Sequence, residues 1–97
     1  MPQFILFCRD KADSLALRME TRPAHLEYFQ KFGNKLNLAG PMLDNAGNPA
    51  GSMLIVEAAD AAEAKAIADA DPYNKAGLFA DVSVIPFKTV MANFPKS

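Results

Sequence analysis

The stretch SMLIVEAADAAEAKAIADA, residues 52–70, joins the pattern of a buried strand directly to the pattern of a helix. Its first part, Ser52 to Ala58, is apolar on both faces, which is typical of a strand that is covered on both sides. Asp60 follows, with Glu63 three residues later, and this spacing is that of a capping box at a helix start. The stretch therefore predicts a strand, a tight junction and an alanine-rich helix over Ala61–Ala70.

The N-terminal third of the chain repeats this order of strand and helix. Phe4 to Arg9 is a short apolar run bounded by charge, which favours a strand with two largely apolar faces. From Ser14 the apolar residues recur at helical spacing, but Pro23 interrupts them, and proline is favoured at the first position of a helix rather than in its interior. We therefore expect a short helix over residues 14–21 and a longer one that begins at Pro23 and ends at Gly33-Asn34.

Two further strands and a short helical turn complete the pattern. The segment Leu36–Asp44 favours extended structure, and Pro41, which cannot donate to a ladder, indicates an edge strand or a bulge. Asp71-Pro72 predicts a helical turn that ends near Gly77, and Leu78–Val90 is the last strand region. The order strand, helix, strand, strand, helix, strand predicts an α+β fold of the ferredoxin-like split βαβ type, a four-stranded antiparallel sheet with helices on one face.

Length, charge and cysteine content narrow the class of protein. The 97 residues fit a single domain over residues 1–97, with a loosely held tail at the C-terminal end, and the net charge of -1 with scattered Lys and Arg gives no basic surface for nucleic acid. The apolar stretches are shorter than the ~20 residues of a membrane span, and the N-terminus lacks the pattern of a signal peptide, so we expect a cytoplasmic protein. Cys8, the single cysteine, excludes an internal disulfide and favours a buried role.

The strand patterns also predict a homodimer. Two main helices cover only one face of a four-stranded sheet, yet the first, third and fourth strands are apolar on both faces. The uncovered face would expose an apolar patch on the order of several hundred Å2, more than monomers usually leave in water. Packing two sheets face to face around a two-fold axis buries this patch.

Acid–base chemistry is the activity that the residue types favour. His25 is the only histidine, so a site with several histidines is impossible, and no nucleophile elbow or phosphate-binding glycine loop occurs; we expect neither metal nor cofactor. In the first turn after Pro23 the helix N-terminus would keep the imidazole neutral and able to accept a proton. Asp71 is the best candidate partner. The alternatives are an ordinary helix residue for His25 and an N-cap for Asp71.

Four short segments resemble the YCII (YciI-like) family. Arg22-Pro23-Ala24-His25-Leu26 is similar to its R-x-x-H signature, and residues 38–41, 51–56 and 70–78 match further motifs in the order and spacing of the family. The last of these, which begins Ala70-Asp71-Pro72-Tyr73, is the most specific. Together the four matches cover roughly residues 3–88, which leaves a tail over residues 89–97.

The resemblance implies a dimeric α/β barrel with a His–Asp pair in a cleft between sheet and helices. It implies a catalytic dyad of His25 and Asp71, with these substrate-binding residues near the pocket: Arg22, Gly40, Pro41, Ser52 and Tyr73. An enzyme of this family removes HCl from a chlorinated hydroxyhydroquinone. We therefore expect a cofactor-free acid–base lyase for a small aromatic or quinonoid substrate. The alternatives are a proton-transfer enzyme like the muconolactone isomerases, a non-catalytic binding protein and a purely structural module.

Overall fold

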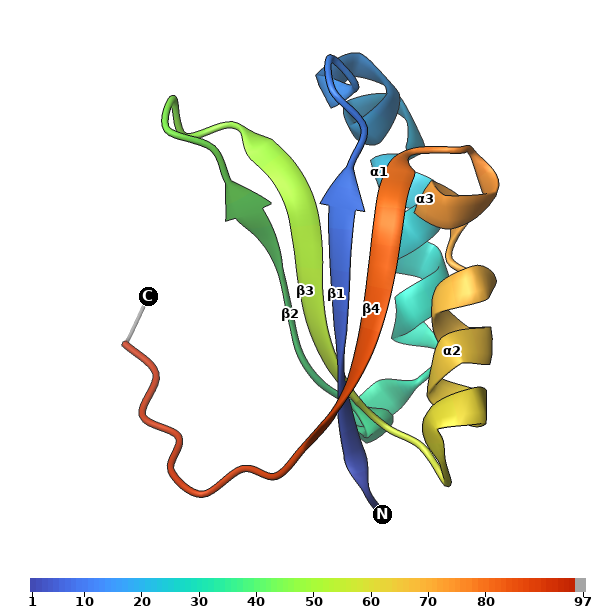
Figure 1. Cartoon of the computed structure of the whole chain (residues 1–97), viewed down its shortest axis with the longest axis vertical. Coiled ribbons are helices and arrows are strands. Elements are labelled where there is room, and N and C mark those ends of the chain that lie inside the picture. The colour runs from blue at the N-terminus through green and yellow to red at the C-terminus, as the bar shows by residue number, and fades with distance from the viewer. Residues whose placement is uncertain (96–97) are drawn as a thin grey trace.

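A four-stranded antiparallel sheet in the order β2-β3-β1-β4 forms one layer of the molecule (Figure 1). The computed structural model describes residues 1–95; the end of the expected tail, residues 96–97, lies outside them. The central strands are β1 (Gln3–Asp10) and β3 (Pro49–Glu57), and the edges are β2 (Leu36–Leu43) and β4 (Phe79–Phe87). The edge position predicted for the proline-containing strand is confirmed, and its pairing with β3 also carries register shifts.

The helices pack together on one face of this sheet (Figure 1). They are α1 (Leu15–Gln30), α2 (Ala61–Asp69) and the single turn α3 (Pro72–Lys75); a short 3-10 turn, Gly33–Lys35, leads into β2. This arrangement confirms the predicted α+β ferredoxin-like fold. At the start of α2 the Asp60 carboxylate accepts the Glu63 backbone N–H at 2.8 Å, as the predicted capping box requires, while the Glu63 carboxylate accepts the N–H of Ala59, one residue before the cap, at 3.3 Å.

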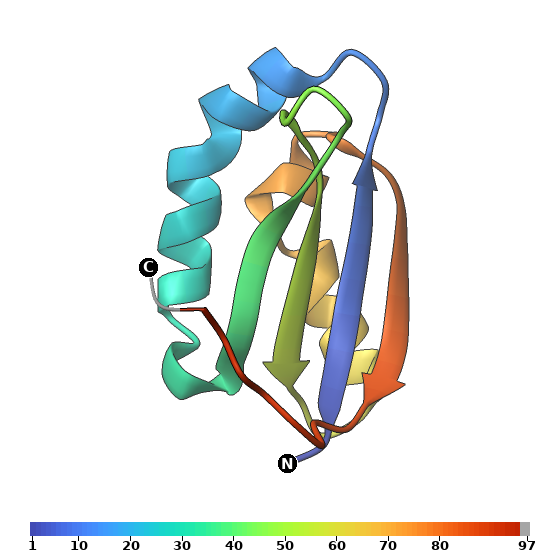
Figure 2. The same cartoon turned by 90° about the vertical axis from the view of Figure 1, so that its left-hand side faces the viewer.

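The prediction of two helices separated at Pro23 is wrong, because α1 runs continuously through the proline (Figure 2). Proline removes one intrahelical hydrogen bond, yet both halves of α1 are anchored on the core side by buried residues, Arg18 before it and His25 and Phe29 after it. Pro23 itself is exposed, where water can solvate the carbonyl that loses its partner. His25 thus lies in the middle of a helix, and the expected influence of a helix N-terminus on its ring is absent.

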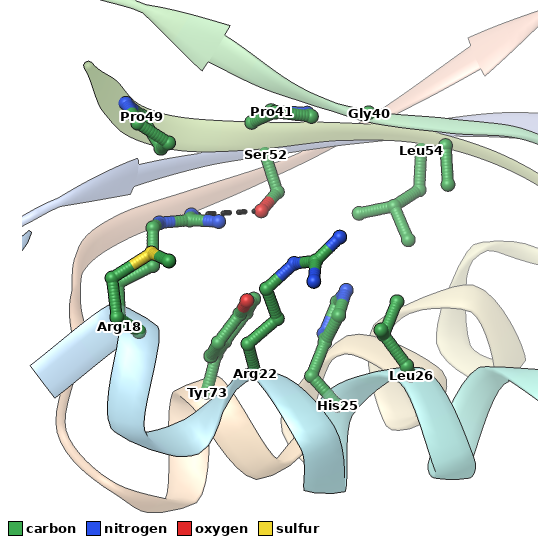
Figure 3. A pocket seen from close by; sticks show the side chains of 12 residues that line it. Arg18, Arg22, His25, Leu26, Gly40, Pro41, Pro49, Ser52, Leu54 and Tyr73 are labelled. Carbon is green, nitrogen blue, oxygen red and sulfur yellow. Dashed lines mark hydrogen bonds between the residues drawn. The ribbon is translucent and has the colours of Figure 1, made fainter.

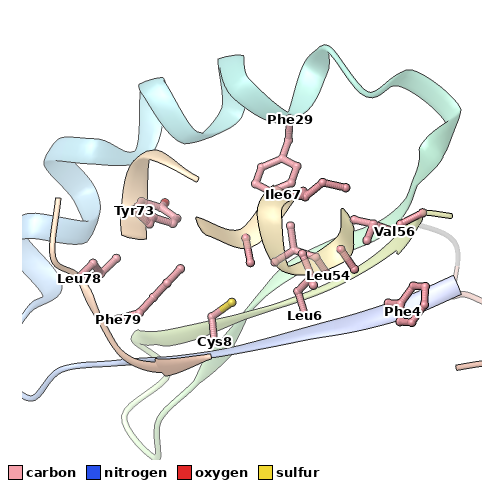
Figure 4. Packing of buried hydrophobic residues seen from close by; sticks show 13 residues of the cluster. Phe4, Leu6, Cys8, Phe29, Leu54, Val56, Ile67, Tyr73, Leu78 and Phe79 are labelled. Carbon is pink, nitrogen blue, oxygen red and sulfur yellow. The ribbon is translucent and has the colours of Figure 1, made fainter. Parts of the chain in front are cut away.

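The hydrophobic core fills the space between the helices and the sheet (Figure 4). Alternation along β1 sends Phe4, Leu6 and Cys8 into this space, as the strand pattern predicts. From the opposite side come Phe29 of α1 and Ile67 of α2. The burial of Cys8 confirms its predicted role.

The other face of the sheet carries no helix. Strand register places Ile5 between Ile55 and Ile85, and Phe87 and Ile85 remain 38% and 43% exposed. The C-terminal segment leaves β4 and crosses this open side of the sheet (Figure 2). The side-chain oxygen of Gln3 holds its start by accepting hydrogen bonds from the backbone N–H and the hydroxyl of Thr89, each at 3.0 Å. Within residues 1–95 no helix is both long and apolar enough to cross a membrane.

Candidate active site

A pocket of about 320 Å³ lies between α1 and the β2–β3 side of the sheet (Figure 3). Its helix side is formed largely by α1 and its sheet side by β2 and β3, so segments far apart in the sequence meet here. The pocket contains every substrate-binding residue that the sequence predicts, together with His25. The lining residues are Arg18, Met19, Arg22, His25, Leu26, Ala39, Gly40, Pro41, Pro49, Ser52, Leu54 and Tyr73.

Asp71 holds the start of α3 and touches α1 at the same time. As the N-cap of α3 it accepts the backbone N–H of Tyr73 at 2.9 Å on Oδ1, the role that the Asp-Pro pattern favours. The same oxygen contacts Nδ1 of His25 at 2.9 Å. The carboxylate is only 1% exposed. The N-cap and the histidine partner are therefore one and the same side chain, not alternatives.

This contact determines which nitrogen of His25 can act as a base. A carboxylate offers only acceptors, so in the neutral ring Nδ1 carries the proton and donates it to Asp71, which leaves the lone pair on Nε2. Within residues 1–95 Nε2 has no hydrogen-bond partner, and the ring lines the pocket. When Nε2 accepts a proton, the buried carboxylate stabilises the cation that forms. An imidazole held in this way can serve as a general base, with the carboxylate fixing its orientation.

Aromatic contacts fix the plane of the imidazole. Tyr73 stacks on His25 with ring centres 4.0 Å apart and an interplanar angle of 18°, and Phe29 meets the ring edge-on at 5.0 Å. The guanidinium carbon of Arg18 lies 4.5 Å from the centre of the Tyr73 ring. Burial raises the pKa of the Tyr73 hydroxyl, although Arg18 and Arg22 oppose this shift, so the hydroxyl keeps its proton and can donate it.

Arg18 is a buried site residue that the sequence patterns did not identify. It is 4% exposed, donates to both oxygens of Asp10 at 2.7 and 2.9 Å, and donates to the Ser52 hydroxyl at 2.8 Å. Burial works against its charge, but the hydrogen bonds and charge of Asp10 more than compensate, so the pKa of Arg18 is raised. Arg18 precedes His25 by seven residues, two turns of one helix, and a continuous α1 would have placed both on one face. Because a helix break was expected at Pro23, the seven-residue spacing of Arg18 and His25 did not indicate a shared face.

Two further observations limit the chemistry of the chain. Burial raises the pKa of the Cys8 thiol to about 12, which leaves no thiolate to act as a nucleophile at neutral pH. Among residues 1–95 no three His, Cys, Asp or Glu side chains gather in a way that could hold a metal ion. The chemically useful groups of the pocket are thus His25 and the polar side chains around it.

Comparison with known sequences identifies relatives along nearly the whole chain. Protein YciI from Escherichia coli O6:H1 (strain CFT073) is 43% identical over 95 residues, which cover 90% of this chain and 97% of the relative, and Protein YciI from Shigella flexneri matches equally well. An uncharacterized protein from Haemophilus influenzae is 35% identical over 96 residues, with the same coverage.

One solved structure with the same fold is that of a dehydrochlorinase. It is 5-chloro-2-hydroxyhydroquinone dehydrochlorinase (TftG) from Burkholderia phenoliruptrix AC1100 in complex with 2,5-dihydroxybenzoquinone. That structure matches with a TM-score of 0.81 and 33% identity over 89% of this chain and 93% of TftG. An antibiotic biosynthesis monooxygenase matches with a TM-score of 0.57 and 13% identity over 94% of this chain and 100% of that chain, which shows the fold alone. The family model of the YCII-related domain matches residues 2–88, and the chain belongs to this family.

Proposed function

We propose that this protein is a cofactor-free acid–base lyase that removes HCl from a chlorinated hydroxyhydroquinone-type ring. His25 acts as the base and Asp71 orients it. The observation that carries the proposal is the contact of Nδ1 with the buried Asp71 carboxylate, which leaves the Nε2 lone pair at a mainly apolar pocket. The likeness to TftG supports the class of substrate.

The elimination needs one group that can both accept and return a proton. A chlorine on an aromatic carbon becomes a leaving group once the ring is in its keto form, in which that carbon is tetrahedral and carries a proton. His25 Nε2 takes the proton of a ring hydroxyl, and the imidazolium delivers a proton to the chlorine-bearing carbon. Imidazole suits this double role because its ordinary pKa lies near neutrality.

A second proton transfer completes the reaction. Nε2 takes the proton of the hydroxyl opposite the first, the electron pair of that O–H bond becomes a second carbonyl, and chloride leaves with its bonding pair. The ring has lost HCl and is a hydroxyquinone, so no oxidant, reductant or cofactor is consumed. Asp71 stabilises the imidazolium in both steps, and such a positioned dyad contributes roughly 10²–10⁴ in rate.

The pocket provides surfaces for the two sides of a planar ring. Leu54 and Leu26 offer apolar contact, and Gly40 and Pro41 of β2 complete the sheet side of the pocket, where Gly40 adds no side chain. Arg22 extends from α1 toward the sheet residues across the pocket and is exposed to solvent (Figure 3). We assign Arg22 and Tyr73 to contacts with ring oxygens, within a volume at the lower end of the ~300–1,000 Å³ range of small-molecule sites.

The test is a substrate assay that separates the lyase from its alternatives. The protein is mixed with 5-chloro-2-hydroxyhydroquinone under nitrogen, and chloride is measured with an ion-selective electrode while quinone formation is followed by absorbance. We expect both products in equal amounts. Turnover of muconolactone without chloride release from the chlorinated ring would favour an isomerase, and tight binding of either ring without turnover would favour a binding protein.

A further inference from the structure

The polar groups at the Arg18 end of the pocket are all hydrogen-bond donors. Arg18 donates from Nε and Nη2 to Asp10 and Ser52, and its Nη1 takes part in neither of these contacts. Ser52 accepts from Arg18 and is 3% exposed, so its own hydroxyl proton is left to donate. Figure 3 shows the Arg18 guanidinium, the Ser52 oxygen and the Tyr73 hydroxyl converging from opposite walls.

The charge of the lining also favours an anion. Three cationic or basic side chains, Arg18, Arg22 and His25, line the pocket, and among the described residues that line it there is no carboxylate. The chain as a whole has a net charge of -1, so the excess of basic side chains is confined to the pocket. Asp10 and Asp71 each lie behind one of these groups, where they hold it in place.

The base and the donors occupy separate ends of one pocket. Arg18 and His25 belong to α1, and the Tyr73 side chain, which comes from α3, contacts both and lies between them (Figure 3). A ring that offers a hydroxyl to His25 Nε2 therefore presents its far oxygen toward Arg18 and Ser52. Preorganised donors at this position stabilise negative charge as it develops, since they need no reorganisation during the reaction.

We propose that Arg18, Ser52 and Tyr73 form an oxyanion subsite that holds a ring oxygen as it gains negative charge, and that Asp10 is a positioning residue for Arg18. The site therefore binds hydroxyquinone anions in preference to neutral rings of the same size. This inference rests on the proposed function for the class of ring, but its test measures binding and needs no turnover.

The experiment compares two probes by calorimetric titration at neutral pH under nitrogen. The anionic probe is 2,5-dihydroxybenzoquinone, whose enolic hydroxyls ionise like a carboxylic acid, and the neutral probe is hydroquinone. Wild-type protein is compared with Ser52→Ala and with Arg18→Gln combined with Asp10→Asn. The double substitution removes both charges, so that no buried carboxylate is left without its partner. Arg9→Gln is the matched control, because Arg9 is an exposed arginine outside the pocket.

We expect the Kd of the anionic probe to rise about tenfold or more in the double variant and about threefold in Ser52→Ala, since each loses charge-assisted donors. The Kd of hydroquinone changes less than about twofold, and Arg9→Gln leaves both values unchanged. With 5-chloro-2-hydroxyhydroquinone as substrate, kcat falls more than KM rises, because the charge develops after binding.

Three results would overturn the subsite. They are equal affinity of the wild type for both probes, parallel weakening of both probes in the variants, or a loss in Arg9→Gln as large as that in the double variant. If the double variant does not fold, Ser52→Ala alone decides, and an unchanged Kd for the anion refutes the proposal. Anion binding that depends on Ser52 or Arg18 without any chloride release would instead refute the lyase and leave the subsite standing.

Discussion

At the scale of single residues, one carboxylate oxygen connects two parts of the site. Asp71 Oδ1 caps α3 by accepting the Tyr73 N–H, and it also accepts a hydrogen bond from Nδ1 of His25. The sequence pattern predicts the cap, because Asp before Pro is a strong helix-start signal. The contact with His25 depends on how α3 packs against α1, which spacing along the chain does not encode, and the family resemblance supplied it.

The tautomer of His25 can be measured directly because the chain has only one histidine. We expect two-bond proton–nitrogen spectra of the imidazole to show a protonated Nδ1 and an unprotonated Nε2 when the ring is neutral, since Nδ1 donates to Asp71. The variant Asp71→Ala should shift the ring toward the Nε2–H tautomer that is usual in free histidine. A wild-type spectrum with Nε2 protonated would contradict the assignment of this nitrogen as the base.

Cys8 should be protected from thiol reagents in the folded protein. Its pKa is raised from 9.0 to about 12 by burial, so at pH 9 the native thiol is almost fully protonated while the unfolded thiol is about half ionised. We expect iodoacetamide to react on the order of 100-fold or more slowly in buffer than in denaturant. Equal rates would show that the β1 core opens readily.

The same shift has a consequence for stability. A thiol with a raised pKa favours the folded state fully below pH 9.0, and this contribution is lost as the pH rises toward 12. Urea unfolding of the wild type should therefore give a falling free energy of unfolding between these values. The variant Cys8→Ala should show a smaller fall over the same pH range, and an equal fall would assign the effect to other groups.

At the scale of elements, strands were easier to predict than helix α1. The apolar runs of β1 and β3 and the proline of β2 indicate their positions and the edge strand, because side-chain alternation and hydrogen-bonding capacity are local properties. The continuity of α1 through Pro23 is a tertiary effect, since the buried residues of both halves pack on the same core. Local propensity alone therefore predicts two separate helices, with Arg18 in the first and His25 in the second.

Replacing Pro23 should stabilise the protein. The exposed position tolerates alanine, which restores the missing N–H of α1, so Pro23→Ala should raise the free energy of unfolding by about 1 kcal/mol. Ala24→Gly, at the neighbouring exposed position, should lower it by about the same amount. Chemical denaturation measures both. A lower stability of Pro23→Ala would mean that the geometry of the proline is required for α1 to fit the sheet.

At the scale of the whole molecule, the main feature is the face of the sheet that carries no helix. Ile5, Ile55, Ile85 and Phe87 lie on this face, and the tail beside it exposes Val90, Met91 and Phe94 by 81%, 84% and 69%. The two-sided apolar pattern of the strands predicts this surface from sequence, because period-two alternation assigns each residue to a face. The identity of its partner is not a local property of the chain.

We propose that a second copy of the chain covers this face, and sedimentation equilibrium at micromolar concentration tests it. The wild type should sediment as a dimer, and Ile85→Glu should sediment as a folded monomer, since it places a charge on the apolar face, next to Ile5. Leu15→Glu, which adds the same charge at a similarly exposed position at the start of α1, should remain a dimer. A monomeric wild type would contradict the proposal.

Chloride release by site variants tests the proposed roles of His25 and Asp71. With 5-chloro-2-hydroxyhydroquinone as substrate, His25→Asn and Asp71→Asn should each lower kcat by about 10²-fold or more, because the first removes the base and the second its orienting charge. Asp69→Asn, an exposed aspartate paired with Lys65, should retain wild-type kcat. Full chloride release by His25→Asn and Asp71→Asn, in folded protein, would show that the reaction does not depend on this pair.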